Sequence, residues 1–128
     1  MQNREIYESA LCLLAESTVA EENADYETRA PYLLAAFCTE SEELDAKLRA
    51  AAKMPSAPTL EAVLLPLDEA FPMMPRLSTA AALYLAAMLI LDSDEERSDK
   101  LYAQYADIVS RLNDSLPASK HPITNKYF

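Results

Sequence analysis

Apolar residues recur every three or four positions in four separate stretches of the chain, and this spacing places them on one face of an α-helix. The first stretch predicts a short amphipathic helix over about residues 4–16. The second predicts a long helix that runs to about Lys53 and either begins near Arg29 or is kinked at Pro31. A proline removes one backbone donor and clashes with the preceding turn, so a helix accepts it only in its first turn or at a kink.

The third stretch, residues 80–91, is apolar on every side of the predicted helix. It is well short of the roughly 20 apolar residues that cross a bilayer, so we expect no membrane span. A helix without a polar face is buried on all sides. We therefore expect this helix, capped by Ser78 and ended by Asp92, to be the central element of a bundle or to be covered partly by another subunit.

The fourth stretch predicts a helix from Asp94 to about Leu116. Asp94 is a good N-cap, and the two glutamates that follow it interact favourably with the positive end of the helix dipole. The buried stripe of this helix is expected to consist of Leu101, Tyr105, Ile108 and Leu112. Pro117 then opens a segment that has no helical periodicity.

Residues 54–77 join the second and third helices and contain five prolines, which forbid a continuous helix. The same connection carries five large apolar side chains, Val63, Leu64, Leu65, Leu67 and Phe71. Exposing all of them to water costs free energy. We therefore expect an ordered strap that lies over the core, with a short extended segment over residues 62–65.

Composition narrows the fold class. The 128-residue chain has no glycine, which sheets, hairpins and phosphate-binding loops usually need where φ is positive. We predict an all-α fold, a small bundle of about four helices over residues 1–116, with the proline-rich strap between helices 2 and 3 and an extended C-terminal arm over residues 117–128. Cys12 and Cys38 lie within helical apolar patterns, so both are expected to be buried, reduced thiols.

Charge limits the partners of the protein. A net charge of -10 and a pI near 4.4 argue against a large phosphate-binding surface, because lysine and arginine supply most of the affinity for duplex nucleic acid. The N-terminal residues do not have the pattern of a signal peptide, so we expect a cytoplasmic protein. With a single histidine in the chain, a zinc site is not expected. We assign no metal, no cofactor and no catalytic residue.

Two pairs of acids offer the main enzymatic alternative. Glu40 with Glu43, and Glu96 with Asp99, are three residues apart, so each pair shares a helix face and could hold Mg²⁺ for nucleotide hydrolysis. The second pair lies in the first turn of its helix, where acids are expected for capping and dipole reasons. A solvated acidic face is therefore the favoured interpretation.

The candidate interface residues lie in the strap, on the third helix and in the arm. Tyr84, Tyr102 and Tyr105 are compatible with an aromatic cluster that stacks a base or a ligand, but aromatic residues at helical spacing usually belong to the core or to an interface. Methionines between two prolines are predicted to be exposed and adaptable, as partner-facing methionines often are. The arm is locally basic with apolar anchors, so it either packs on its own bundle or reaches a neighbouring subunit. The full set is Met73, Met74, Tyr84, Met88, His121, Ile123, Lys126, Tyr127 and Phe128.

Three segments carry a resemblance to a known family, and they read IYESALCLLAE, DYETRAPYLLAAFCTESEELD and LPLDEAFPMMPRLSTAAALYLAAMLILDSDEERSDKLYAQYADIV. Together they resemble head–tail connector, or adaptor, subunits, which are small helical structural proteins of tailed phages and prophages. The resemblance implies that the helical bundles assemble as a ring below the portal. It also implies that the C-terminal segment engages a neighbouring subunit or the next ring.

The resulting expectation is a non-enzymatic virion protein that self-associates and links portal to tail. We expect it in the cytoplasm of the bacterial host, and in the virion once assembled. Its expected partners are further copies of itself in a ring and other phage structural proteins, with no sequence-specific nucleic acid and no membrane. Two alternatives stay open, namely a helical protein–protein interaction module unrelated to virions and a metal-dependent nucleotide hydrolase.

Overall fold

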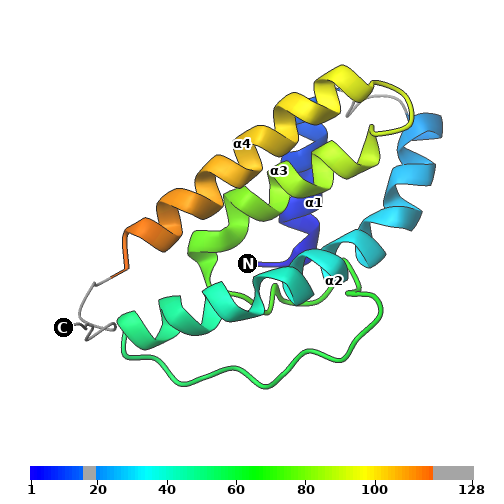
Figure 1. Cartoon of the computed structure of the whole chain (residues 1–128). Coiled ribbons are helices and arrows are strands. Elements are labelled where there is room, and N and C mark those ends of the chain that lie inside the picture. Colours follow the sequence, from blue (N-terminus) through cyan, green and yellow to red (C-terminus); the bar gives the residue numbers. More distant parts are fainter. Residues whose placement is uncertain (16–19, 117–128) are drawn as a thin grey trace.

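The computed structural model describes residues 1–15 and 20–116 of the chain (Figure 1). In these ranges the protein is a bundle of four α-helices with no β-strand, which confirms the all-α prediction. A single turn of 3-10 helix precedes the third α-helix. The elements are α1 (Asn3–Leu14), α2 (Ala20–Ala51), η1 (Pro75–Leu77), α3 (Ser78–Leu89) and α4 (Glu95–Asp114).

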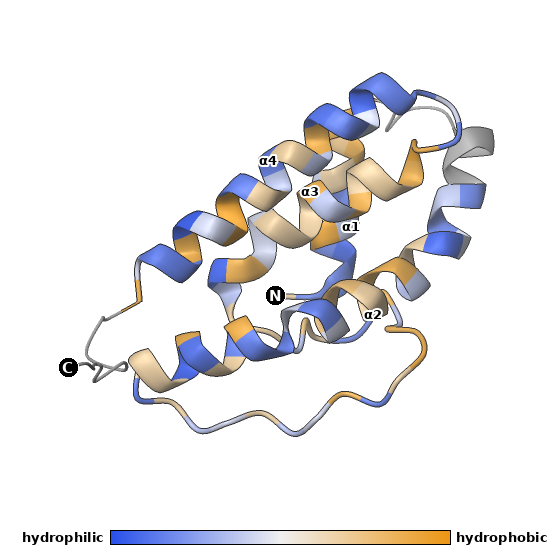
Figure 2. Ribbon diagram, in the orientation of Figure 1, coloured by the Kyte–Doolittle hydropathy of each residue, from blue (hydrophilic) through white to orange (hydrophobic). Residues whose placement is uncertain are grey.

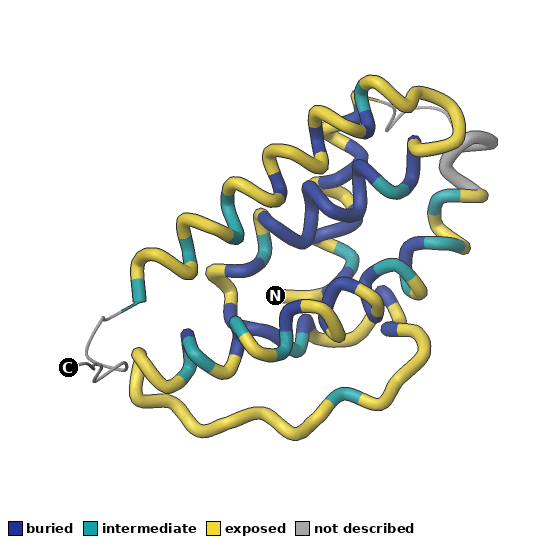
Figure 3. Tube along the Cα trace, in the orientation of Figure 1, coloured by how far each residue is buried: buried dark blue, intermediate teal, exposed yellow. Residues whose placement is uncertain are grey.

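Helix α3 is the centre of the bundle. It packs against α1, α2 and α4, and its residues are almost all buried (Figure 3). The hydropathy of the ribbon shows the same division, since α3 is largely apolar while polar residues recur along the exposed side of α4 (Figure 2). The expectation of a central helix is therefore confirmed, and the chain covers α3 with its own elements. The buried residues of α3 are Ala80, Ala81, Ala82, Leu83, Tyr84, Leu85, Ala86, Ala87 and Leu89.

Helix α2 is longer at its N-terminal end than the sequence predicts. It begins at Ala20, so Pro31 lies inside it and not in its first turn. Figure 1 shows that α2 bends between its light-blue part and its cyan part, in agreement with the kinked alternative. The strap contacts α2 at this bend, where the backbone N–H of Leu65 donates to the carbonyl of Pro31 at 3.0 Å.

The strap between α2 and α3 is buried in its second part only. Leu65, Leu67 and Phe71 are buried, whereas Val63 is 76% exposed and Leu64 is 38% exposed. The expectation of an ordered strap over the core is right for the second part and wrong for the first. The predicted extended segment over residues 62–65 forms no strand; the described chain has one isolated bridge, between Gln2 and Ala70.

The first residues of the chain hold the second part of the strap. Asn3 donates its backbone N–H to Glu69 O and its side-chain Nδ2 to Pro66 O, both at 2.9 Å. Arg4 donates its backbone N–H to Leu67 O at 2.9 Å. The first N–H groups of a helix have no partner inside the helix. The strap therefore completes the N-terminus of α1, and α1 in turn fixes the strap.

The two predicted N-caps have different outcomes. Asp94 caps α4 as expected, because its Oδ1 accepts the N–H of Arg97 at 3.1 Å. The prediction that Ser78 caps α3 is wrong, since Ser78 is the first residue of α3 and makes no cap contact. Helical backbone already begins in the 3-10 turn before it, so the N–H groups in need of partners lie further upstream.

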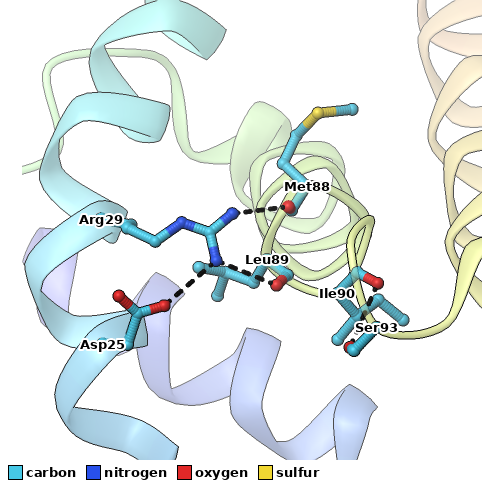
Figure 4. Close-up of polar contacts among 6 residues, drawn as sticks. All are labelled: Asp25, Arg29, Met88, Leu89, Ile90 and Ser93. Carbon is cyan, nitrogen blue, oxygen red and sulfur yellow. Dashed lines mark hydrogen bonds and ion pairs between the residues drawn. The ribbon is translucent and has the colours of Figure 1, made fainter.

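Arginines from other helices close the C-terminal ends of α3 and α1. Arg29 of α2 donates to Met88 O at 3.1 Å and to Leu89 O at 3.3 Å (Figure 4). Arg97 of α4 donates to Leu13 O at 2.9 Å. A cation is favourable at a helix C-terminus, where carbonyls without intrahelical partners carry partial negative charge. These contacts fix the ends of the central helix and of α1 against their neighbours.

The two cysteines lie in different environments, and both are free thiols. Cys38 is buried, as expected, and burial raises the pKa of its thiol to about 12. The prediction of burial is wrong for Cys12, which is exposed on α1. The face of α1 that meets the core consists of other residues, namely Ile6, Tyr7, Ala10, Leu11 and Leu14.

Candidate interaction surface

An aromatic cluster lies where α2, α3, α4 and the strap meet. Phe37 of α2 is at its centre, with ring centroids 6.5 Å from Phe71 of the strap and 5.8 Å from Tyr84 of α3. Tyr105 of α4 lies 5.3 Å from Tyr84 and 5.2 Å from Tyr102. The tilted and edge-on geometries are those that aromatic quadrupoles favour. The three tyrosines that the sequence places in the core or at an interface therefore form one cluster.

Glu40 of α2 faces two hydroxyls of this cluster. Tyr84 Oη lies 3.4 Å from one carboxylate oxygen, and Tyr105 Oη lies 3.4 Å from the other. Burial, followed by the charge and hydrogen bond of Glu40, raises the pKa of Tyr84 to about 12. Burial and the charge of Glu40 also raise the pKa of Tyr105. Both phenols stay protonated at neutral pH and can donate to the carboxylate.

These contacts weaken the reading of the acid pairs as a metal site. Both oxygens of Glu40 face tyrosine hydroxyls, and Glu43 lies 4.0 Å from the ammonium of Lys47. Glu96 and Asp99 are exposed in the first two turns of α4. Over residues 1–15 and 20–116, no three acidic, histidine or cysteine side chains are grouped so that they could hold a metal ion.

A groove opens beside the aromatic cluster, and we call it the α2–α4 groove. Helix α4 packs mainly along α3, so a hollow of about 360 Å³ is left between α4 and the second half of α2. Its apolar floor includes Leu44, Tyr105 and Val109, and Glu40 and Glu43 add negative charge. The full lining is Glu40, Glu43, Leu44, Lys47, Tyr105, Ala106, Val109, Ser110 and Asn113.

Burial along α4 decreases toward its C-terminal end. Leu101 and Tyr105 are buried, while Ile108 and Leu112 are only partly buried, although all four belong to the predicted stripe. Leu116, the last described residue, is also partly buried against the core. The end of α4 that borders the groove therefore leaves apolar surface accessible.

Three of the predicted interface residues are buried inside the chain. Met73 is 8% exposed, Met74 is 7% exposed and Tyr84 is 6% exposed. The methionines are drawn inward because Asp45 Oδ1 accepts the N–H of Met74 at 2.8 Å. Tyr84 lies on the central helix, most of whose residues are buried.

The other predicted interface residues, Met88 and those of the arm, are not buried residues of the described core. Met88 is half-buried and borders a second hollow, of about 460 Å³, beside the exposed Leu91 and Tyr102. It therefore remains a surface candidate. The five candidates of the arm, His121, Ile123, Lys126, Tyr127 and Phe128, lie outside the described residues.

An ion pair between Asp45 and Arg49, which the apolar pattern of the sequence does not reveal, fixes the end of the strap. Asp45 is 4% exposed and accepts from Arg49 Nε at 2.8 Å as well as from Met74 N. Arg49 also donates to Pro72 O at 3.0 Å. The spacing of four residues between an aspartate and an arginine was visible in the sequence. Their partners 23 and 29 residues away were not.

No family model, curated protein or solved structure matches this chain. None of the helices in the described ranges combines the length and the apolarity that a membrane crossing requires.

Proposed function

We propose that the protein is a non-enzymatic structural subunit that works through contacts with other proteins, in the manner of a head–tail connector of a tailed phage or prophage. The observation that supports this best is the α2–α4 groove, an accessible apolar hollow with an acidic rim at the end of the bundle where the C-terminal arm begins. Accessible apolar surface of this kind is typical of protein-binding sites.

The surface that contacts partners must lie mainly on elements other than α3. The chain buries α3 itself, so copies of the protein have no need to cover that helix. Among the described residues, the accessible surfaces that partners could use include the α2–α4 groove and the patch of Met88, Leu91 and Tyr102. Two separate patches on one small subunit suit a ring, in which each copy meets a neighbour on either side.

Mass measurement in solution tests the proposal directly. We expect the 14.2 kDa chain to form a closed assembly of many copies, alone or on addition of a phage portal protein. We also expect its peptides in purified particles induced from the host. A chain that stays monomeric with the portal protein present, and that is absent from particles, contradicts the proposal.

The second candidate is a helical interaction module that does not belong to a virion. The observation in its favour is the closed core, since a bundle that buries its most apolar helix unaided can be a stable monomer. The same measurements separate the two candidates. A magnesium-dependent hydrolase fits less well, because Glu40 faces tyrosine hydroxyls on both oxygens.

A further inference from the structure

We propose that the C-terminal arm, residues 117–128, folds back and occupies the α2–α4 groove of its own chain. The arm would then be the intramolecular occupant of a surface that partners must reach. This inference concerns the free chain, so it holds or fails independently of the proposed role in a virion.

Charge is the first argument for this occupant. The arm holds Lys120 and Lys126, two of the eleven cationic side chains, and none of the 21 acids, so the rest of the chain carries -12. The groove presents Glu40 and Glu43 against a single lysine. A basic segment is attracted to an acidic surface, and opposite charges on the two fix how the segment lies.

Apolar matching is the second argument. The arm carries Ile123, Tyr127 and Phe128, which a solvated tail has no means to bury. The groove offers Leu44 and Val109, both only partly buried, next to the edge of the tyrosine cluster. Aromatic residues packed against such a floor remove apolar surface from water on both sides.

Chain geometry is the third argument, and it favours the chain's own groove over that of a second copy. Lining residues of α4 extend from Asn113 back to Tyr105, a distance of about 12 Å along the helix. Twelve residues reach up to about 40 Å when extended, so the arm can reverse direction after Pro117 and still cover the groove. A tether this short corresponds to an effective concentration in the millimolar range. At micromolar protein, its own arm reaches the groove first.

Site-specific photo-crosslinking tests the inference. Ala106 is exposed and lines the groove, whereas Gln104 is exposed on the other flank of α4 and lines none of the hollows described above. The photoreactive p-benzoylphenylalanine replaces either residue in the full-length chain, and peptide mass mapping locates the crosslink. At position 106 we expect a crosslink to residues 117–128 within a single chain, with a yield that does not depend on protein concentration. At position 104 we expect none.

The outcomes divide cleanly. A position-106 crosslink to the arm at twice the monomer mass shows that a second copy supplies the arm, and it overturns the intramolecular assignment. Crosslinks from position 106 that avoid the arm, or equal yields at 106 and 104, overturn the docking itself. An assembly that forms normally in either case leaves the proposed function standing.

A charge variant sharpens the same test. Glu43 has an 86% exposed side chain, so Glu43→Lys changes the rim of the groove without disturbing the core. We expect the crosslinking yield at position 106 to fall about two- to five-fold, the range that loss of an exposed ion pair gives. Lys126→Glu in the Glu43→Lys background should restore it. If Glu43→Lys changes the helical circular dichroism, Glu43→Gln takes its place. An unchanged yield in the folded variant contradicts the electrostatic part of the inference.

Discussion

The connection between α2 and α3 has two halves of similar composition, but one half is exposed and the other packs into the core. The outer half, residues 55–64, contains two prolines, is exposed over most of its length and borders a hollow of about 470 Å³ that α2 also lines. The inner half, residues 65–74, also contains two prolines, yet it buries five large apolar side chains, Leu65, Leu67, Phe71, Met73 and Met74.

The halves differ in where their backbone polar groups find partners. The inner half is fixed at its start by Pro31, along its middle by the N-terminal residues and at its end by Asp45 and Arg49. The outer half is held by Leu60, whose N–H donates to Glu42 Oε2 at 2.9 Å. Buried backbone groups need partners, so only a segment with partners supplied from elsewhere can follow its apolar side chains into the core. Apolar content alone does not decide burial.

Removing a large side chain from each half gives the largest expected contrast. Phe71 is 9% exposed and its ring lies 6.5 Å from Phe37, whereas Val63 is 76% exposed. We expect Phe71→Ala to lower the free energy of unfolding by about 4 kcal/mol. Val63→Ala should change it by less than about 0.5 kcal/mol. Urea unfolding followed by circular dichroism measures both, and similar losses for the two variants would show that the halves do not differ in stability.

Cutting the polar anchor of the inner half should have the next largest effect. Asp45→Ala leaves the Met74 N–H and the Arg49 guanidinium without their buried acceptor. We expect a loss of about 3 kcal/mol in the free energy of unfolding, because an uncompensated buried cation is costly. Asp45→Asn is the matched control, since its amide oxygen can still accept from Met74, and it should lose clearly less. Unfolding midpoints in urea that match the wild type for both variants would contradict this anchor.

Features that depend on nearby residues were predictable from the sequence. Apolar spacing located all four helices, because helical periodicity is set within a few turns. Asp94 was recognised as a cap for the same reason, since its partner is three residues away. The all-apolar third helix correctly indicated the centre of the fold. The sequence placed Tyr84, Tyr102 and Tyr105 in the core or at an interface, because aromatic residues at helical spacing usually lie there.

Features that depend on distant partners were not predictable in the same way. The inward position of Met73 and Met74 follows from Asp45 on another helix, and the role of Glu40 requires tyrosines from α3 and α4. The early start of α2 places Pro31 inside a long helix, and its carbonyl accepts from Leu65, a residue 34 positions away that helical periodicity does not reveal. The candidate groove is likewise a product of how α4 packs, which no single stretch encodes.

Alkaline pH should affect the inner half through the tyrosine cluster. Phe37 connects Phe71 to Tyr84, whose pKa is raised to about 12 in the folded protein from an ordinary value of 10.0. The unfolded chain therefore loses this proton at lower pH than the folded chain does. The stabilisation is complete below pH 10 and is lost as the pH rises to about 12, by about 2 kcal/mol over that window.

Urea unfolding at several pH values between 9 and 12, with tyrosinate absorbance followed in parallel, measures this loss. The comparison variant is Tyr84→Phe, which keeps the ring and removes the titrating group, so its stability should fall less steeply. The outer half contains no tyrosine and supplies no titration of its own in this range. Parallel pH profiles for the wild type and Tyr84→Phe would show that Tyr84 does not carry the effect.

Protease cleavage should distinguish the two halves locally, although the difference in free energy between them is the smallest considered. The two halves each contain a Glu-Ala bond with an exposed glutamate, at Glu61 in the outer half and at Glu69 in the inner half. Backbone bonds fix the inner site, since Glu69 accepts from Asn3 N and donates to Pro66 O. A protease specific for glutamate should therefore cut after Glu61 well before Glu69, because cleavage needs local freedom of the backbone.

The variant Glu42→Ala removes the side-chain acceptor that anchors the outer half at Leu60. It removes the acceptor of Leu60 N–H, so we expect cleavage after Glu61 to speed up about two- to five-fold, in line with the loss of one partly buried hydrogen bond. Global stability should change by less than about 0.5 kcal/mol. Cleavage after Glu69 should keep its wild-type rate, since its anchors are untouched. Equal acceleration at both bonds would mean that the halves open together, and the distinction between them would then be one of exposure and not of anchoring.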